Sequence, residues 1–185
     1  MKFIQTVALC VGLFTSAAWA QAPVSAISGL DVTKYQGKWF QVALIPNKFQ
    51  AMCVADTTAT YTPLPSGRIE VLNRCRTCNG SFTEAVGEAR FAQPPPQSNA
   101  RPAQLQVRFA PAWLSWLDAV WGNYWVLALD KDYQWALVGE PSRSFLWLLS
   151  RTPTLDAALQ ERILATAVAQ GYNREQVKLS PVTQP

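Results

Sequence analysis

Between residues 38 and 151, apolar and polar positions alternate in short runs, which is the two-residue period of strands that bury one face. The clearest run is 103–109, where alanine, leucine, valine and phenylalanine alternate with glutamine, glutamine and arginine. Turn-forming residues, such as Asn79-Gly80, separate the runs. The pattern predicts eight strands, over residues 38–46, 54–62, 68–76, 82–92, 103–109, 123–131, 133–140 and 144–151. Eight short strands in series favour an up-and-down antiparallel barrel over a Greek-key sandwich.

Helical patterns flank this series of strands. Asp31 is placed to cap a single turn before the first strand. After the last strand, Thr154 is predicted to cap a helix over 155–170, which Gly171 ends. Its expected apolar stripe is Leu155, Leu159, Ile163 and Val168. Residues 176–182 favour a final short strand. The predicted fold is all-β: an eight-stranded antiparallel barrel with a C-terminal α-helix packed outside.

The first twenty residues have the pattern of an export signal. Lys2 precedes a mostly apolar run, and Ala18-Trp19-Ala20 matches a cleavage site, so we expect a signal peptide over 1–20 and a single domain over 21–185. Cys10 comes too early in this segment to favour a lipid-modified N-terminus. The mature protein is therefore expected in the periplasm or outside the cell, with a lipid anchor in the outer membrane as the less favoured alternative.

Composition excludes several chemistries. The chain has 185 residues and no histidine, which removes Ser-His-Asp and Cys-His catalysis and histidine-ligated zinc. Its net charge is +4, but the basic residues are scattered, which argues against nucleic acid as a partner. We expect no metal site, no cofactor and no catalytic residue.

Three cysteines follow the signal: Cys53, Cys75 and Cys78. In an oxidising compartment two of them should form a disulfide, which joins Cys53 to one of the other two. Cys75 is favoured because it ends a predicted strand, whereas Cys78 lies in the next turn and would then be a free or intermolecular thiol. The C-x-x-C spacing of Cys75 and Cys78 lies at a strand end rather than a helix start, so a redox role is not favoured.

Gly37, Trp39 and Arg151 mark the two ends of the strand series. An arginine guanidinium over the face of an indole gains ~0.5–2 kcal/mol, so Arg151 on Trp39 would seal one end of a barrel. A barrel that is sealed at one end and open at the other can hold a small molecule.

Counting in steps of two from Trp39 and Arg151 predicts which side chains point into the barrel. The inward positions are Ala43, Ile45, Ala59, Tyr61, Leu105, Val107, Phe109, Phe145, Trp147 and Leu149, with Gln41 as a polar member. Large aromatic walls next to small residues are typical of ligand pockets. The alternative is that these side chains simply fill a small barrel.

Three segments resemble the signatures of the lipocalins, and in particular their bacterial and apolipoprotein D-like branch. Residues 35–40 read Tyr-Gln-Gly-Lys-Trp-Phe, residues 124–130 read Tyr-Trp-Val-Leu-Ala-Leu-Asp, and residues 145–153 read Phe-Leu-Trp-Leu-Leu-Ser-Arg-Thr-Pro. The resemblance implies the barrel fold, a structural role for Gly37, Trp39 and Arg151, and a small hydrophobic ligand. It also supports the Cys53–Cys75 pair.

By the same resemblance Trp147 and Trp121 match aromatic positions near the ligand in bacterial relatives. The expected ligand site is therefore Trp147, Trp121, Phe145, Phe109, Val107, Tyr61, Ala59, Ala43 and Ile45. Many bacterial members are anchored through a cysteine at the signal cleavage site, where this chain has Ala20-Gln21.

The connection 113–121 is unusually aromatic. Trp113 and Trp116 could form a lid over the mouth, make a peripheral membrane contact, or pack within the protein. The predicted function is binding or transport of a fatty acid, lysophospholipid or similar molecule in the cell envelope. The alternatives are a stress protein that associates with membranes or partners, and a thiol-dependent isomerase, which is disfavoured because no thiol is expected inside the barrel.

Overall fold

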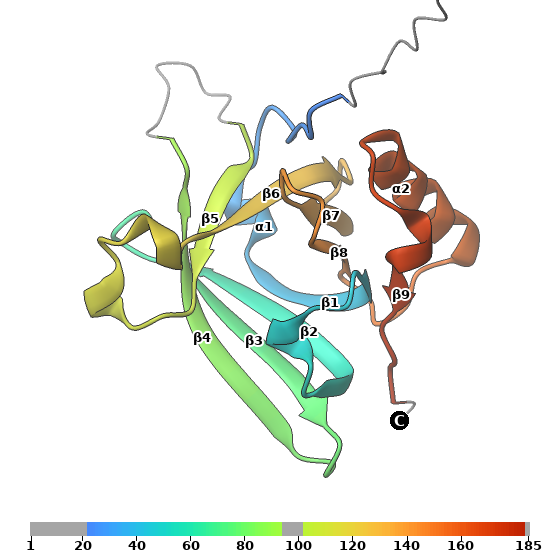
Figure 1. Ribbon diagram of the computed structural model, residues 1–185, viewed down its shortest axis with the longest axis horizontal. Coiled ribbons are helices and arrows are strands. Elements are labelled where there is room, and N and C mark those ends of the chain that lie inside the picture. The colour runs from blue at the N-terminus through green and yellow to red at the C-terminus, as the bar shows by residue number, and fades with distance from the viewer. Residues whose placement is uncertain (1–21, 94–101, 184–185) are drawn as a thin grey trace, which may run out of the picture.

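The computed structural model describes residues 22–93 and 102–183, and its centre is a closed antiparallel sheet (Figure 1). The strands are β1 (Gly37–Leu44), β2 (Cys53–Pro63), β3 (Ile69–Thr77), β4 (Phe82–Phe91), β5 (Gln104–Arg108), β6 (Gly122–Leu129), β7 (Trp135–Gly139) and β8 (Leu146–Ser150). Each strand pairs with the next, and β1 pairs with both β2 and β8, which closes the ring. The predicted eight-stranded barrel is confirmed. The expected signal peptide, residues 1–20, lies outside the described residues.

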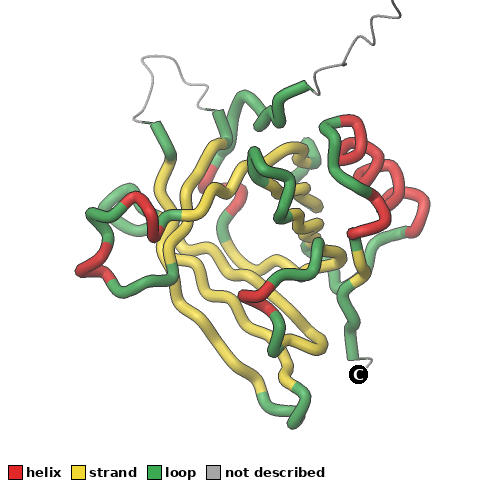
Figure 2. Tube along the Cα trace, viewed as in Figure 1, coloured by secondary structure: helices red, strands yellow, loops and turns green. Residues whose placement is uncertain are grey.

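The C-terminal helix lies outside the ring of strands (Figure 2), whereas the short helix before β1 lies at the closed end. The α-helices are α1 (Val32–Tyr35) and α2 (Ala157–Ala169), and the 3-10 turns are η1 (Lys48–Gln50), η2 (Ala112–Leu114), η3 (Asp118–Val120) and η4 (Arg174–Gln176). The Asp31 carboxylate accepts from the Thr33 amide at 2.9 Å, which confirms the predicted cap of α1.

The start of α2 differs from the prediction. Its cap is Asp156, whose carboxylate accepts from the amide of Leu159 at 2.9 Å, so Thr154 stays outside the helix. The helix packs against the outside of the barrel through Gln160, Ile163, Leu164 and Ala167. These positions follow the spacing of three and four residues that keeps side chains on one face. Val168 lies five residues beyond Ile163, which turns it away from that face, and it is 45% exposed.

Trp39 and Arg151 lie together at one end of the barrel. The Trp39 side chain is fully buried, and the Arg151 guanidinium lies 3.8 Å from the centre of its ring. The guanidinium donates to the carbonyl oxygens of Lys34, Gln36 and Lys38 at 2.8 to 2.9 Å, so it also ties α1 to β1. Gly37 makes the corner between these elements with a φ of +88°.

A β-bulge in β1 reverses which side chains of its second half point into the barrel. Gln41 pairs with Leu149 of β8, but Ala43 pairs with Leu148, so one extra residue is inserted at Val42. Beyond the bulge Ala43 and Ile45 therefore point outward, and they pack in the cluster beneath α2. The prediction that these two side chains line the interior is wrong. Leu44, which pairs with Trp147, takes the inward position instead.

The C-terminal segment completes the wall near the open end. A short strand, β9 (Lys178–Leu179), pairs with β1, and the Ser180 amide donates to the Val42 carbonyl at 2.8 Å. On the other side, the Asp56 amide of β2 donates to the Pro181 carbonyl at 3.0 Å. Hydrogen bonds from Thr183 and Arg76 hold the pKa of Asp56 down at about 2. Residues 178–183 thus join β1 to β2 where those strands no longer pair with each other.

A disulfide joins Cys53 of β2 to Cys75 of β3, with a Cα–Cα distance of 5.5 Å. This confirms the favoured pairing, and Cys78 is a free, exposed thiol. The two cysteines are 22 residues apart in the sequence, and closing a loop of that length by a disulfide contributes roughly 3 kcal/mol to stability in the chain-entropy description.

Candidate ligand-binding site

The strand pairings define the inner face of the barrel. Trp39 faces inward and pairs with Ala59, and Tyr61 pairs with Val71, so Ala59, Tyr61 and Val71 also face inward. The pairing then continues the face through Ala89 to Val107. Ala59, Tyr61 and Val107 therefore lie on the predicted face. Within the described strands β1 to β8, the inward positions carry no charged side chain.

Filling of the interior differs from one inward position to the next. Trp39 at the closed end is completely buried, and so are Ala136, Val138 and Val126 on the neighbouring strands β7 and β6. Other inward side chains keep part of their surface accessible to water, namely Leu44, Val107, Tyr124 and Trp147. Side chains therefore leave part of the inner wall uncovered, at Tyr124 as well as at Trp147.

An aromatic stack stands at the open end. The rings of Phe145 and Trp147 are parallel within 5°, with centroids 5.8 Å apart, and Phe49 from the β1–β2 connection lies 5.9 Å from Phe145. Phe109 is placed just after β5 over Gly87, where a Cβ would come within 2.6 Å of its ring. Phe49 and Phe109 are 66% and 43% exposed. The predicted residues Phe145, Trp147 and Phe109 thus lie at or near the mouth.

Two amides connect this stack to the wall. The Trp147 indole N–H donates to Gln50 Oε1 at 2.9 Å, and Gln50 Nε2 donates to Gln41 Oε1 at 2.8 Å. The Gln41 amide in turn donates to the Ser180 hydroxyl at 2.9 Å. Sequence reasoning missed Gln50, because a loop residue has no periodicity that would place it.

Three tyrosines meet at the floor. The Tyr124 hydroxyl of β6 lies 2.8 Å from that of Tyr35 and 2.7 Å from that of Tyr61. Burial raises the pKa of Tyr61 to about 12 and the pKa values of Tyr35 and Tyr124 well above their ordinary value. All three therefore stay neutral hydrogen-bonding groups at physiological pH. Tyr35 and Tyr124 belong to the signature segments, but nothing in the alternation indicated that their hydroxyls meet.

Trp121 lies apart from this inner face. Gly122 pairs with Val107 and faces inward, so Trp121 is directed outward. Its ring lies under the Arg90 and Arg108 guanidinium groups at 4.1 and 5.3 Å, and its indole N–H donates to the Ser115 carbonyl at 2.9 Å. The structure therefore separates Trp121 from Trp147, although the resemblance to bacterial lipocalins implies that both lie near the ligand.

The outer cluster around Trp121 is charged. Arg108 is only 6% exposed and pairs with Glu88 at 2.9 Å, and Arg68 pairs with the same carboxylate at 2.8 Å. Partial burial alone would raise the pKa of Glu88, but the hydrogen bonds from the two arginines hold it below its ordinary value. This cluster anchors the base of the β5–β6 connection to the outside of the barrel.

The tip of the β5–β6 connection lies on the opposite side of the molecule from α2 (Figure 1). Trp113 and Trp116 are 73% and 75% exposed, so neither packs within the protein and neither covers the mouth as a closed lid. Exposed tryptophans of this kind are suited to the headgroup region of a membrane.

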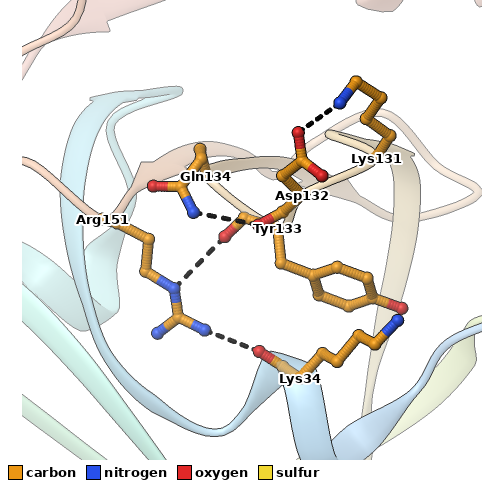
Figure 3. Close-up of a pocket in the computed structure, with 6 residues that line it drawn as sticks. All are labelled: Lys34, Lys131, Asp132, Tyr133, Gln134 and Arg151. Carbon is orange, nitrogen blue, oxygen red and sulfur yellow. Dashed lines mark hydrogen bonds and ion pairs between the residues drawn. The ribbon is translucent and has the colours of Figure 1, made fainter.

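A recess of about 390 Å³ lies at the closed end (Figure 3). It is lined by Lys34, Lys131, Asp132, Tyr133, Gln134 and Arg151. Arg151 donates across it to the Tyr133 and Lys34 carbonyls, and Lys131 pairs with Asp132. None of the expected ligand residues lines it. It is a polar hollow on the far side of the Trp39 and Arg151 plug, so a ligand in the barrel would not reach it.

An antiparallel barrel that is plugged at one end and has an uncharged inner face belongs to the class of barrel-shaped binding proteins for small apolar molecules. Residues 30–182 match the family model described as the lipocalin-like domain. The chain belongs to the lipocalin family, whose members generally bind or transport small hydrophobic ligands.

Several relatives agree with this assignment. The temperature-induced lipocalin-1 of Arabidopsis thaliana is 40% identical over 156 residues, which cover 84% of this chain and 81% of that protein. The outer membrane lipoprotein Blc of Escherichia coli K12 is 31% identical over 151 residues, with coverage of 81% and 78%. Mouse apolipoprotein D is 32% identical over 170 residues, with coverage of 84% and 80%. The predicted resemblance to bacterial lipocalins and apolipoprotein D is confirmed.

Among solved structures, insecticyanin of the tobacco hornworm Manduca sexta has the same fold, with a TM-score of 0.66 and 16% identity over 89% of this chain and 87% of that one. Within the described residues, no helix is both long and apolar enough to cross a membrane.

Proposed function

We propose that this lipocalin binds and carries a small hydrophobic or amphiphilic molecule, such as a fatty acid or lysophospholipid, inside its barrel, and that it catalyses no reaction. The observation that carries the proposal is the inner face, which is uncharged in the described strands and only partly covered by side chains, with an aromatic stack at the mouth. An acyl chain gains free energy in such a place because it leaves water for an apolar surface.

The contacts that we propose for the ligand come from the mouth and the wall. They are Phe145, Trp147, Phe109, Val107, Ala59 and Tyr61, whereas Ala43, Ile45 and Trp121 face the outside. Burial of one aromatic side chain contributes ~1.5–3 kcal/mol. Three such contacts supply roughly 5–9 kcal/mol, and micromolar affinity corresponds to about 8 kcal/mol.

The thiols support a non-catalytic role. Cys53 and Cys75 are joined to each other, and Cys78 is exposed on the turn after β3, so none of the three offers a free thiol inside the barrel. A thiol-dependent isomerase would need such a group within reach of its ligand.

The proposed location is the periplasm or the outside of the cell, after removal of residues 1–20. The Cys53–Cys75 disulfide supports this location, because disulfides persist in oxidising compartments. One relative is itself named an outer membrane lipoprotein.

A titration with a fluorescent fatty-acid analogue tests the carrier function. We expect saturable binding to the native protein and roughly tenfold or greater weakening in Trp147→Ala, since loss of a buried aromatic contact removes more than about 1.4 kcal/mol. Trp116→Ala is the matched control, because it removes an exposed indole and should leave the affinity unchanged. Absence of saturable binding, or equal affinities for the two variants, would contradict the proposal.

Peripheral membrane contact is the second proposed function, and the high exposure of Trp113 and Trp116 favours it. Co-sedimentation with phospholipid vesicles should decrease in a Trp113→Ser/Trp116→Ser double variant, because Trp stabilises binding at the headgroup region. If the native protein and the double variant sediment equally, the β5–β6 connection has no role at a membrane.

A further inference from the structure

The floor of the barrel brings together three hydroxyl groups from separate parts of the chain. Tyr35 belongs to α1, Tyr61 to β2 and Tyr124 to β6. The rings of Tyr35 and Tyr61 are 5.2 Å apart, those of Tyr61 and Tyr124 are 6.1 Å apart, and Tyr35 also packs on Trp39 at 4.9 Å. Ring packing of this kind holds the hydroxyls in place, so the group is preorganised.

The hydrogen bonds of this group do not use all its protons. Three phenols carry three hydroxyl protons, but only two hydrogen bonds connect them, Tyr35 to Tyr124 and Tyr61 to Tyr124. Among the described residues no further acceptor lies within hydrogen-bond distance of the three oxygens. One O–H is therefore left without an acceptor in the part of the chain that the structure describes. Tyr35 and Tyr61 are 2% and 5% exposed, and a buried donor without an acceptor is unfavourable.

Tyr124 differs from the other two tyrosines in its exposure. It faces the interior, where its partner across β5 is Leu105, and it is the one of the three that keeps accessible surface. When Tyr35 and Tyr61 both donate to the Tyr124 oxygen, the Tyr124 O–H is the spare donor. Two incoming hydrogen bonds also polarise that O–H and make it a stronger donor.

We propose that the tyrosine trio, Tyr35, Tyr61 and Tyr124, is a subsite that donates one hydrogen bond to a neutral carbonyl oxygen at the inner end of an elongated apolar ligand. This inference rests on the proposed carrier function and adds the class of ligand. A neutral ketone or ester fits better than a carboxylate, because the described strands place no cation on the inner face to offset the lost hydration of an anion. The guanidinium of Arg151 lies beyond the Trp39 ring, and its N–H groups already donate to the main-chain carbonyls of Lys34 and Lys38.

A pair of ligands of equal shape tests the subsite. The first is a long-chain methyl ketone, and the second replaces its C=O by C=CH₂. We expect the native protein to bind the ketone about fivefold to tenfold more tightly, which is the range for one net hydrogen bond. In Tyr124→Phe this preference should disappear, while binding of the alkene stays unchanged. Tyr133→Phe is the matched control, since the Tyr133 hydroxyl accepts from the Asp31 amide outside the barrel.

The outcomes separate this inference from the carrier function. If both ligands bind the native protein equally well, the subsite is overturned and the carrier function stands. If neither ligand binds while the fluorescent fatty-acid analogue does, the subsite is again overturned; if none of the three binds, the carrier function itself fails. The infrared carbonyl band of a ¹³C-labelled ketone gives a measurement that needs no variant: we expect a shift to lower frequency in the native protein relative to a hydrocarbon solvent. An unshifted band would overturn the subsite even if Tyr124→Phe does not fold.

Discussion

Replacement of Arg151 by methionine tests how much the closed end contributes to stability. The methionine keeps an unbranched apolar stem over Trp39 and removes only the guanidinium. That group stacks on the indole at 3.8 Å and donates four hydrogen bonds, to the carbonyls of Lys34, Gln36, Lys38 and Tyr133. We expect the variant to fold, because the barrel core does not depend on Arg151, but to be clearly less stable.

The magnitude follows from these contacts. A partly desolvated cation over an indole contributes about 1–2 kcal/mol. Because Arg151 is partly exposed, each of its hydrogen bonds is worth only about 0.5 kcal/mol, at the low end of the usual range. The total loss is therefore roughly 3 kcal/mol, which corresponds to a decrease in Tm of about 6–12 °C for a domain of this size.

Urea unfolding followed by circular dichroism measures this loss. The matched control is Arg162→Met, which removes an arginine from the exposed side of α2 and should change the unfolding free energy by less than about 0.5 kcal/mol. If the Arg151→Met variant is as stable as this control, the inference that Arg151 stabilises the closed end of the barrel is refuted.

Two further predictions follow from buried groups. Burial raises the pKa of Tyr61 and Tyr172 to about 12. The folded protein therefore keeps protons that the unfolded chain loses near pH 10, so their contribution to stability is complete below about pH 10 and is lost as the pH rises toward 12; ultraviolet titration in which every tyrosine ionises near pH 10 would contradict this. In Gly139→Ala, the new methyl group would overlap the Tyr172 hydroxyl and lie 2.8 Å from Leu127, so we expect a loss of about 1–3 kcal/mol. Gly122→Ala is the control, with its nearest neighbour at 3.8 Å, and equal melting temperatures for the two variants would show that the site is not tightly packed.

The alternation of apolar and polar residues was sufficient to predict the barrel. Its period of two places residues such as Val107 and Trp147 inward wherever the strands are regular. The two-residue period gives the wrong face beyond Val42, because the β-bulge inserts one residue there and reverses the alternation. The pattern of apolar and polar residues does not indicate this bulge. For that reason Ala43 and Ile45 were assigned to the wrong face.

The candidate site was predictable only where a strand carries it. Trp121 precedes β6 in an irregular connection, and its direction depends on the pairing of Gly122 with Val107, which no local pattern shows. Gln50 is brought to Trp147 by the fold of a loop. The meeting of Tyr35, Tyr61 and Tyr124 depends on contacts between elements far apart in the chain.

The way residues 178–183 bridge β1 and β2 has a consequence for the order of folding. Residues near the C-terminal end of the sequence complete the wall. Their contacts with β1 and β2 therefore join residues that are more than a hundred positions apart. Such non-local contacts slow folding, because the entropy of closing a long loop is lost before they form. In a nascent chain that lacks residues 178–183, the gap between β1 and β2 beside Val42 stays open. The barrel wall can therefore close completely only after synthesis has passed residue 183.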